Sequence, residues 1–293
     1  MSALEYGYGA DGLTVRFRKC EREPDTWKNE LRHAARELTR HADRPLWLCS
    51  SGGMDSEIMC RVFFDEGIQF SVLTLEHRAG TNMSDAKRVA KWCWERGIPH
   101  KHERVDMEAF FAKDIDAYLA DGYVTDSLSR YFQLKVLAAV AELGGLAVLG
   151  GGMFIMRIPK DMNAPRMHDV FLRFNDGHVI LPEWAKRSGV PHEPYFFAST
   201  PELCLSYLRI PAVRFSYEHP EILVTEASAL TAKRLVHQTE WPDMESRYTN
   251  FGFTGTRDSV PKTQARIRAA YGEKLHSFNL PLHEMIEQLT PYI

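Results

Sequence analysis

The stretch that decides the fold runs from residue 47 to residue 56 and reads Trp47-Leu48-Cys49-Ser50-Ser51-Gly52-Gly53-Met54-Asp55-Ser56. The apolar residues 46–49 predict a short buried strand, and the serines and glycines after them predict a tight turn. Residues 55–66 then predict a helix, which ends at Gly67. A strand, a glycine turn and a helix in this order are typical of an α/β fold.

The same alternation continues toward the C-terminus. Further strands are predicted at 70–75, 102–105 and 146–149, with helices near 85–96, 107–120 and 131–143. Strands that alternate with helices at this interval favour a parallel sheet with helices on both faces. Ligands of such sheets bind beyond the carboxyl ends of the strands. Both glycine clusters of the chain, 52–53 and 150–152, fall at such ends.

The loop after the first of these strands combines features that suit phosphate. Gly52 and Gly53 have no Cβ, so the backbone can pass close to a ligand. The first N–H groups of a helix have no partner within the helix, and the positive end of the helix dipole lies beside them. Ser51 and Ser56 add hydroxyl donors. Asp55, placed among anions, implies a bridging divalent cation such as Mg²⁺.

The loop also resembles a known family. Ser51-Gly52-Gly53-Met54-Asp55-Ser56 matches the SGGxDS signature of the N-type ATP pyrophosphatases, also called the PP-loop or adenine nucleotide α-hydrolase-like superfamily. The chain has no Walker-type GxxxxGK[ST] sequence, so the ordinary P-loop reading fails. Members of the superfamily bind ATP, cleave it to AMP and pyrophosphate, and transfer AMP to an oxygen of a substrate. A nucleophile then displaces the AMP.

The resemblance implies a role for each loop residue. By this resemblance, pyrophosphate is bound by Ser51, Gly52, Gly53 and Ser56. Met54 lies between them in the same cofactor-binding loop. Asp55 holds Mg²⁺ and acts in catalysis, and the strand from Leu73 to Leu75 lies beside adenine. The implied fold is the HUP-like PP-loop sheet. On this basis we expect three segments: 1–44, a hairpin and a helix; 45–154, the nucleotide-binding domain; and 155–293, a mainly helical substrate or lid region.

Within the superfamily, the order of elements looks most like the synthetase domain of asparagine synthetase and β-lactam synthetase. By that resemblance, Gly150 and Gly151 in the turn after residue 149 contact the nucleotide. In those enzymes this turn carries an acidic residue that binds a second Mg²⁺, whereas residues 150–154 here contain none. Only about 45 residues precede the nucleotide-binding segment, so we expect no glutaminase domain. Free ammonia, an amine substrate or a partner subunit would then supply the nucleophile.

The last segment is harder to interpret. Residues 170–174 and 178–181 flank Asn175-Asp176-Gly177, which predicts a hairpin, and helices are expected near 201–208, 226–238, 262–271 and 282–289. A stretch that ends at Lys262 mixes aromatic, charged and glycine residues. By analogy with a C-terminal lysine of β-lactam synthetase, Lys262 is our candidate for a catalytic cation, with Arg247 and Arg257 as alternatives.

Composition narrows the remaining alternatives. The chain carries 36 Lys and Arg against 39 Asp and Glu, a formal net charge of -3, so no overall basic excess indicates nucleic acid. A small molecule, a peptide or a nucleobase remains open as the substrate. Our first hypothesis is an ATP-dependent ligase that adenylates such a substrate. The second hypothesis is a PP-loop enzyme that modifies a nucleobase in tRNA or DNA. The third is a nucleotide-binding protein without catalysis, which the acid-free turn at 150–154 favours.

The cysteines and the apolar runs bear on location. The five cysteines lack CxxC spacing, which predicts neither a disulfide framework nor a zinc site. No apolar run approaches the roughly 20 residues that cross a bilayer, and the first residues do not resemble a signal peptide. We therefore expect a reduced, cytoplasmic setting and no membrane.

Overall fold

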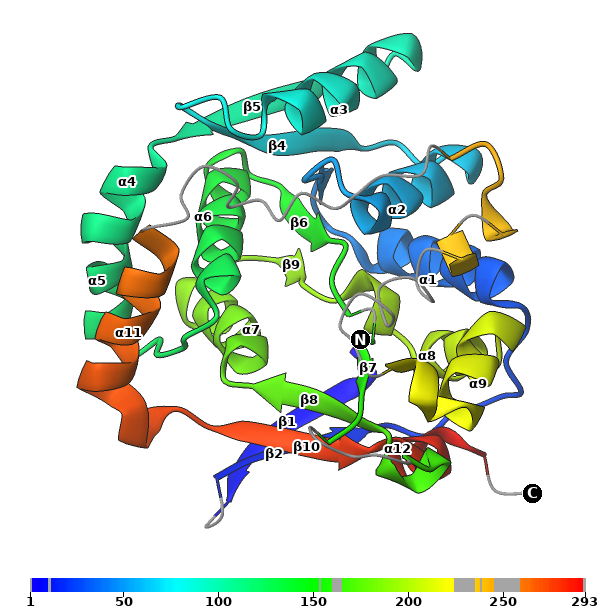
Figure 1. Ribbon diagram of the computed structural model, residues 1–293. Helices are drawn as coiled ribbons and strands as arrows, with labels where there is room; N and C mark the ends of the chain where they lie inside the picture. The colour runs from blue at the N-terminus through cyan, green and yellow to red at the C-terminus, as the bar shows by residue number, and fades with distance from the viewer. Residues whose placement is uncertain are drawn as a thin grey trace.

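A five-stranded parallel sheet forms the centre of the computed structural model, which describes residues 2–9, 12–152, 154–159, 165–223, 235–237, 239–244 and 259–291. The strand order is β5-β4-β3-β6-β9 (Figure 1). The strands are β3 (Leu46–Cys49), β4 (Ser71–His77), β5 (His100–Val105), β6 (Leu146–Leu149) and β9 (His192–Glu193). The predicted α/β fold with a parallel sheet is confirmed.

Helices cover both faces of this sheet (Figure 1). On one side lie α1 (Trp27–His41) and α2 (Met54–Asp65), and on the other lie α6 (Leu128–Glu142) and α7 (Gly177–Ser188). α3 (Met83–Glu95) links β4 to β5. Residues 107–120 form one helical segment, made of α4 (Met107–Ala109), a π-helical turn (Phe110–Asp114) and α5 (Ile115–Ala120). Among the described residues, no helix is long and apolar enough to cross a membrane.

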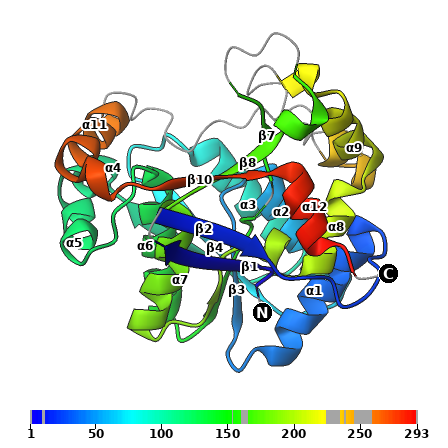
Figure 2. The same ribbon diagram turned by 90° about the horizontal axis from the view of Figure 1, so that it is seen from below.

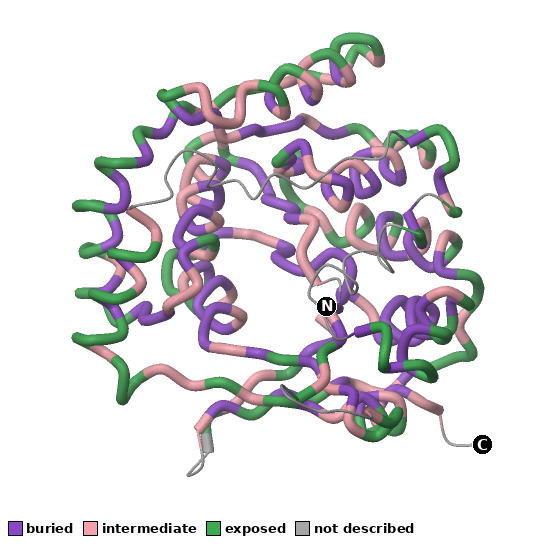
Figure 3. The backbone as a smooth tube through the Cα atoms, viewed as in Figure 1, coloured by how far each residue is buried: buried purple, intermediate pink, exposed green. Residues whose placement is uncertain are grey.

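The central strands are buried on both faces, as parallel strands between two helix layers must be. Leu48, Val72 and Val148 have no exposed surface, and Figure 3 shows the buried backbone concentrated at the middle of the molecule. β5 is an edge strand, and its side chains are exposed or half-buried up to the buried Val105. The core therefore holds the strand ends in a fixed frame from which the loops project.

A second layer joins the N-terminal hairpin to the C-terminal half. The hairpin consists of β1 (Leu4–Gly9) and β2 (Gly12–Phe17), and it lies beside β10 and α12 (Figure 2). A three-stranded antiparallel sheet has the order β10-β8-β7, with β10 (Ser277–Pro281), β8 (Phe171–Asn175) and β7 (Met156–Arg157). The described helices of this half include α8 (Pro201–Leu208), α9 (Pro211–Glu218), α11 (Ser259–Tyr271) and α12 (Leu282–Leu289).

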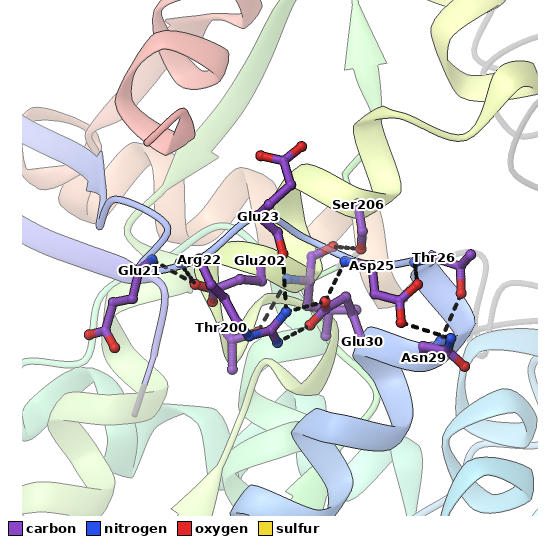
Figure 4. Close-up of polar contacts among 11 residues, drawn as sticks. Glu21, Arg22, Glu23, Asp25, Thr26, Asn29, Glu30, Thr200, Glu202 and Ser206 are labelled. Carbon is purple, nitrogen blue, oxygen red and sulfur yellow. Dashed lines mark hydrogen bonds and ion pairs between the residues drawn. The ribbon is translucent and has the colours of Figure 1, made fainter. Parts of the chain in front are cut away.

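Two buried carboxylates fasten the chain between β2 and α1 (Figure 4). Glu30 of α1 is 1% exposed and accepts two hydrogen bonds of 2.6 Å from the Arg22 guanidinium. Glu202 of α8 accepts hydrogen bonds from the backbone N–H of Glu21 at 2.7 Å and of Arg22 at 3.3 Å. Buried carboxylates are tolerated only when they are paired and hydrogen-bonded. The Glu30 contacts therefore hold Arg22 on α1, and the Glu202 contacts attach the N-terminal segment to the C-terminal half.

The predicted hairpin over residues 170–181 is wrong. Residues 171–175 do form a strand, β8, but it pairs with β7 and β10, and residues 178–181 belong to helix α7. The buried Gly177, Ile180, Leu181 and Ala185 are spaced at i, i+3, i+4 and i+8, which places them on one face of a helix. Asp176 does not make a hairpin turn, because its carboxylate accepts hydrogen bonds from the Tyr8 hydroxyl at 2.8 Å and the His276 N–H at 2.5 Å.

Other predicted elements of the last segment have mixed outcomes. The helices at 201–208 and 282–289 are confirmed as α8 and α12, and the helix at 262–271 is confirmed as part of α11. The short strands β7, β9 and β10 were not predicted. Most of the helix expected at 226–238 lies outside the described residues, as does Met153.

Candidate functional site

The loop between β3 and α2 requires glycine at position 52. Gly52 has a φ of +79°, a backbone conformation that residues with a Cβ rarely adopt. A Cβ at this position would lie only 2.6 Å from the Cβ of Asp85 on α3. Gly53 is the N-cap residue of α2, which continues for 12 residues. The loop therefore turns sharply against α3 and presents the N-terminus of a full-length helix.

Three serine hydroxyls converge at this helix N-terminus. The hydroxyl of Ser50 donates to that of Ser56 over 3.3 Å, and the Ser51 and Ser56 hydroxyl oxygens are 3.5 Å apart. Ser56 donates in turn to the carbonyl oxygen of Gly53 at 2.9 Å. Ser51 is exposed, whereas Ser50 and Ser56 are buried. The structure thus brings Ser51 and Ser56 together, and it adds Ser50, which the sequence analysis did not select.

Asp55 lies in the first turn of α2 with its side chain 28% exposed. Its Oδ1 atom is 3.3 Å from Nε2 of His237, a side chain that is 1% exposed. His237 is 182 positions away in the chain, in the aromatic and charged stretch that ends at Lys262, but the sequence analysis did not select it. Its contact with Asp55 is a component of the site that the sequence analysis missed.

The residues present suit a magnesium-bound nucleotide. Serine hydroxyls and a carboxylate are the hard oxygen groups that Mg²⁺ prefers, and proteins commonly hold Mg²⁺ through one or two carboxylates together with substrate phosphates. The described part of the chain contains no group of three or more His, Cys, Asp or Glu side chains that would hold a metal ion without such a substrate. Asp55 therefore fits a cation that arrives with phosphate oxygens.

A pocket lies between α2 and α3, beside the loop that connects β3 to α2. It is lined by Ser50, Gly52, Glu57, Cys60, Arg88, Val89 and Trp92. Arg88 forms an ion pair of 2.8 Å with Asp85, the residue against which Gly52 packs. The pocket thus contains a cation, Arg88, beside the loop between β3 and α2. The sequence analysis did not select Arg88, because only the packing of α3 on the loop brings it there.

The glycine turn after β6 is packed closely by other parts of the chain. A Cβ at Gly150 would lie 3.3 Å from the backbone nitrogen of Ser56, and one at Gly151 would lie 2.6 Å from the carbonyl oxygen of Pro194. Gly152 has a φ of +95°, and a Cβ there would lie 2.9 Å from Ala198. β6 therefore ends directly against the first turn of α2. Nucleotide contacts by Gly150 and Gly151 stay a prediction.

The strand expected beside adenine ends next to the loop. The backbone N–H of Ser50 donates to the carbonyl oxygen of Leu73 at 2.9 Å, which ties the loop to β4. The carbonyl oxygen of Leu75 accepts a 2.7 Å hydrogen bond from the side-chain amide of Asn82. Leu73 is buried and Leu75 is half-buried. The adenine contact of Leu73 and Leu75 stays a prediction. Leu73 pairs with Cys49, the last residue of β3, and β4 continues past Leu75 to His77.

The structure does not bring Lys262 to the loop. Lys262 is exposed in the first turns of α11. That helix is tied to the α4–α5 segment, where Arg266 pairs with Asp116 at 3.0 Å, and none of the described contacts joins Lys262 to the loop. Its catalytic role stays a prediction. Arg247 and Arg257 lie outside the described residues.

Comparison with known proteins gives distant likenesses. No family model matches the chain, and no curated protein sequence matches it. Among solved structures, the NMN synthetase of Francisella tularensis superposes with a TM-score of 0.35 and 12% identity over 77% of this chain and 98% of that one. The U34-tRNA thiolase NcsA of Methanococcus maripaludis, solved with its [4Fe-4S] cluster, gives 0.33 and 14% over 85% and 79%.

A third likeness is to the NH3-dependent NAD synthetase of Campylobacter jejuni, with a TM-score of 0.32 and 12% identity over 83% of this chain and 92% of that one. The function proposed below is therefore based on the residues of the site.

Proposed function

We propose that this protein is an ATP pyrophosphatase-type enzyme, which cleaves ATP to AMP and pyrophosphate, adenylates an acceptor and lets a nucleophile displace the AMP. The convergence of the Ser50, Ser51 and Ser56 hydroxyls with Asp55 at the N-terminus of α2 carries this proposal. Helix N-termini are favourable sites for phosphate because unpaired N–H groups and the helix dipole act together there. An aspartate in the same turn repels phosphate unless a cation lies between them, and nucleotide phosphates bind together with Mg²⁺.

Each loop group has a defined role in this reaction. The hydroxyls of Ser51 and Ser56 and the first N–H groups of α2 hold the β- and γ-phosphates. Charge builds up on these oxygens as the bond to the α-phosphate breaks, and fixed donors aimed at developing charge are an effective source of catalysis. Mg²⁺, when bound at Asp55, neutralises part of this charge. Arg88, beside Gly52 in the adjoining pocket, is placed to contribute further positive charge.

The chemistry after adenylation follows the resemblance to the amide-forming branch. The acceptor is a small molecule, a peptide or a nucleobase, and ammonia or an amine, from solution or from a partner, displaces AMP. Sulfur transfer through a cysteine of this chain is less favoured. Burial raises the pKa of Cys60 and of Cys204 well above the usual value, and a thiol acts as a nucleophile in its thiolate form.

An unbiased search for the acceptor tests the proposal. The protein is incubated with ATP, Mg²⁺ and a metabolite extract, and adenylated species are sought by mass spectrometry. We expect a new adenylate with the natural sequence, loss of that species in Asp55→Ala, and its retention in Asp65→Ala. Asp65 is the matched control because it is exposed at the other end of the same helix. Equal adenylation in Asp55→Ala would contradict the proposal.

A non-catalytic nucleotide-binding protein is the second candidate, and the acid-free turn at 150–154 is the observation that favours it. Calorimetric titration with ATP and Mg²⁺ separates the two. Tight binding without turnover in the presence of the extract would favour this second candidate over the enzyme.

A further inference from the structure

A segment of the C-terminal half returns to the helices that flank the loop. The carboxylate of Asp243 accepts a 2.5 Å hydrogen bond from Arg61 of α2, and Lys28 of α1 donates to the carbonyl oxygen of Glu240 at 3.2 Å. The ring of Trp241, which is 4% exposed, meets that of Trp27 edge-on at 5.7 Å. Residues 239–244 are thus anchored on both α1 and α2.

Charged groups also connect this anchor to α2. The hydrogen bond from Arg61 holds the pKa of Asp243 below its usual value, so its carboxylate is ionised at neutral pH. Arg61 also bonds Glu57, one helical turn along α2 from Gly53, at 2.9 Å. The backbone N–H of Trp241 donates to the carbonyl oxygen of His237 at 2.9 Å. The anchored residues therefore fix the position of His237 relative to α2.

His237 is the residue that this anchor brings to the site. Its Nε2 is 3.3 Å from Oδ1 of Asp55, and its side chain is 1% exposed. Because a carboxylate can only accept, Nε2 faces Asp55 as a donor. A carboxylate has two oxygens, so contact through Oδ1 is compatible with cation coordination through Oδ2. Catalytic contacts are often long before a ligand binds and tighten in the complex.

We propose that His237 is a positioning residue for Asp55, which holds the carboxylate in the orientation that receives the cation of the nucleotide. This inference rests on the proposed function, because it assigns His237 to the same site. Side chains that orient metal-binding groups typically change metal affinity or activity by about 10- to 100-fold when they are removed. The anchor through Trp241 and Asp243 gives His237 the fixed position that such a role requires.

The test measures metal affinity and does not depend on turnover. Mn²⁺ binding to the protein with a non-hydrolysable ATP analogue is followed by electron paramagnetic resonance. His237→Ala should weaken the Mn²⁺ affinity by about 10- to 100-fold, while the affinity for the analogue without metal stays unchanged. His237→Gln, which retains a side-chain N–H, should restore most of the Mn²⁺ affinity. His192→Gln, at a half-buried histidine of β9, is the matched control and should bind Mn²⁺ as the natural sequence does.

The outcomes separate this inference from the proposed function. If the natural sequence binds Mn²⁺ with the analogue and His237→Ala binds it equally well, the positioning role is overturned and the proposed function stands. If the natural sequence binds no Mn²⁺ with the analogue, the proposed function itself fails. Should His237→Ala lose its fold by circular dichroism, His237→Phe keeps a ring without an N–H and takes its place in the same comparison.

Discussion

The molecule has two glycine turns at the carboxyl ends of neighbouring strands, and they differ in what surrounds them. The turn after β3 is followed by the serine hydroxyls and Asp55 at the start of α2. The turn after β6 packs against the chain itself, with Gly151 close to the Pro194 carbonyl oxygen and Gly152 close to Ala198. Both turns have glycine at strand ends, yet among the described residues around them only the first turn combines it with hydroxyl donors, a carboxylate and a helix N-terminus.

This difference shows why glycine alone is a weak indicator of a ligand site. In the first turn, Gly52 allows the backbone to fold against Asp85 while the hydroxyls stay at the helix end. In the second turn, Gly150 lets β6 approach the backbone of Ser56 closely enough to support the first loop. Glycine thus permits close approach in both places, and the neighbouring polar groups decide whether a ligand or the protein makes that approach.

The largest expected effect comes from adding one methyl group to each turn. Gly52→Ala combines a positive φ with a Cβ 2.6 Å from that of Asp85, so the loop must distort. We expect Mg²⁺·ATP affinity to fall on the order of 100-fold, since strain of about 1–3 kcal/mol falls on the binding loop itself. Gly151→Ala overpacks the second turn, and we expect a loss of about 1–3 kcal/mol in the free energy of unfolding.

Calorimetry and urea unfolding on both variants measure these effects. The packing around the second turn predicts that Gly151→Ala changes mainly stability and that Gly52→Ala changes mainly affinity. An equal loss of ATP affinity in the two variants would instead assign Gly151 to the nucleotide site and remove the contrast between the turns.

A smaller effect is expected from removing one hydroxyl near each turn. Ser56→Ala deletes a hydroxyl that the proposed function assigns to phosphate binding, and hydrogen bonds to charged groups contribute about 1.5–3 kcal/mol. We therefore expect kcat/KM for pyrophosphate release to fall roughly 10- to 100-fold. The matched control is Ser199→Ala, because Ser199 is also buried and donates to the carbonyl oxygen of Phe196 at 2.8 Å. Steady-state kinetics that showed equal losses in both variants would argue against a phosphate contact by Ser56.

The third effect concerns His178 and depends on pH. The Tyr195 hydroxyl donates to the carbonyl oxygen of His178 at 2.8 Å, and a Cβ at Gly151 of the second turn would lie 3.1 Å from the Tyr195 ring. Burial, with Arg130 adding to it, lowers the pKa of His178 to about 3. An unfolded histidine titrates near 6.5, so between about pH 6.5 and pH 3 the unfolded chain binds a proton that the folded chain does not. Stability should therefore fall as the pH drops through this window, by up to about 1.4 kcal/mol per pH unit for this group.

Urea unfolding at pH 7.5, 6.5 and 5.5 checks this dependence. His178→Gln should remove about one proton from the slope below pH 6.5. A part of the slope should remain, because burial and His102 lower the pKa of the half-buried His100 to about 4. An unchanged slope in His178→Gln would show that His178 does not stay neutral in the folded protein.

Local sequence signals were sufficient for the first turn and for much of the fold. The apolar run of β3, the glycines and the helix of α2 lie within about twenty consecutive residues, so their pattern is visible in one stretch. The same holds for β6 and α12, whose bounds match the prediction. The hairpin predicted at Asn175-Asp176-Gly177 was wrong. The Asp176 carboxylate accepts hydrogen bonds from Tyr8 and His276, which are distant in the sequence.

Non-local contacts explain what could not be predicted. β10 pairs with β8 about a hundred residues earlier, and neither sequence indicates that partner. His237 meets Asp55 only because Trp241 and Asp243 attach their segment to α1 and α2. Arg88 joins the site through the packing of α3 against Gly52. In each case the neighbouring sequence gives no sign of the contact, because the two partners come together only in the folded chain.

The identity of the bond that breaks in ATP tests the central claim most directly. The protein is given Mg²⁺, ATP and the metabolite extract, and the phosphorus-containing products are followed by ³¹P nuclear magnetic resonance. The roles assigned to Ser51, Asp55 and Ser56 predict one pyrophosphate for each AMP, counted as free AMP and as adenylate together, with neither product formed by Asp55→Ala. Formation of ADP and inorganic phosphate, or equal pyrophosphate release by Asp55→Ala, would contradict the account.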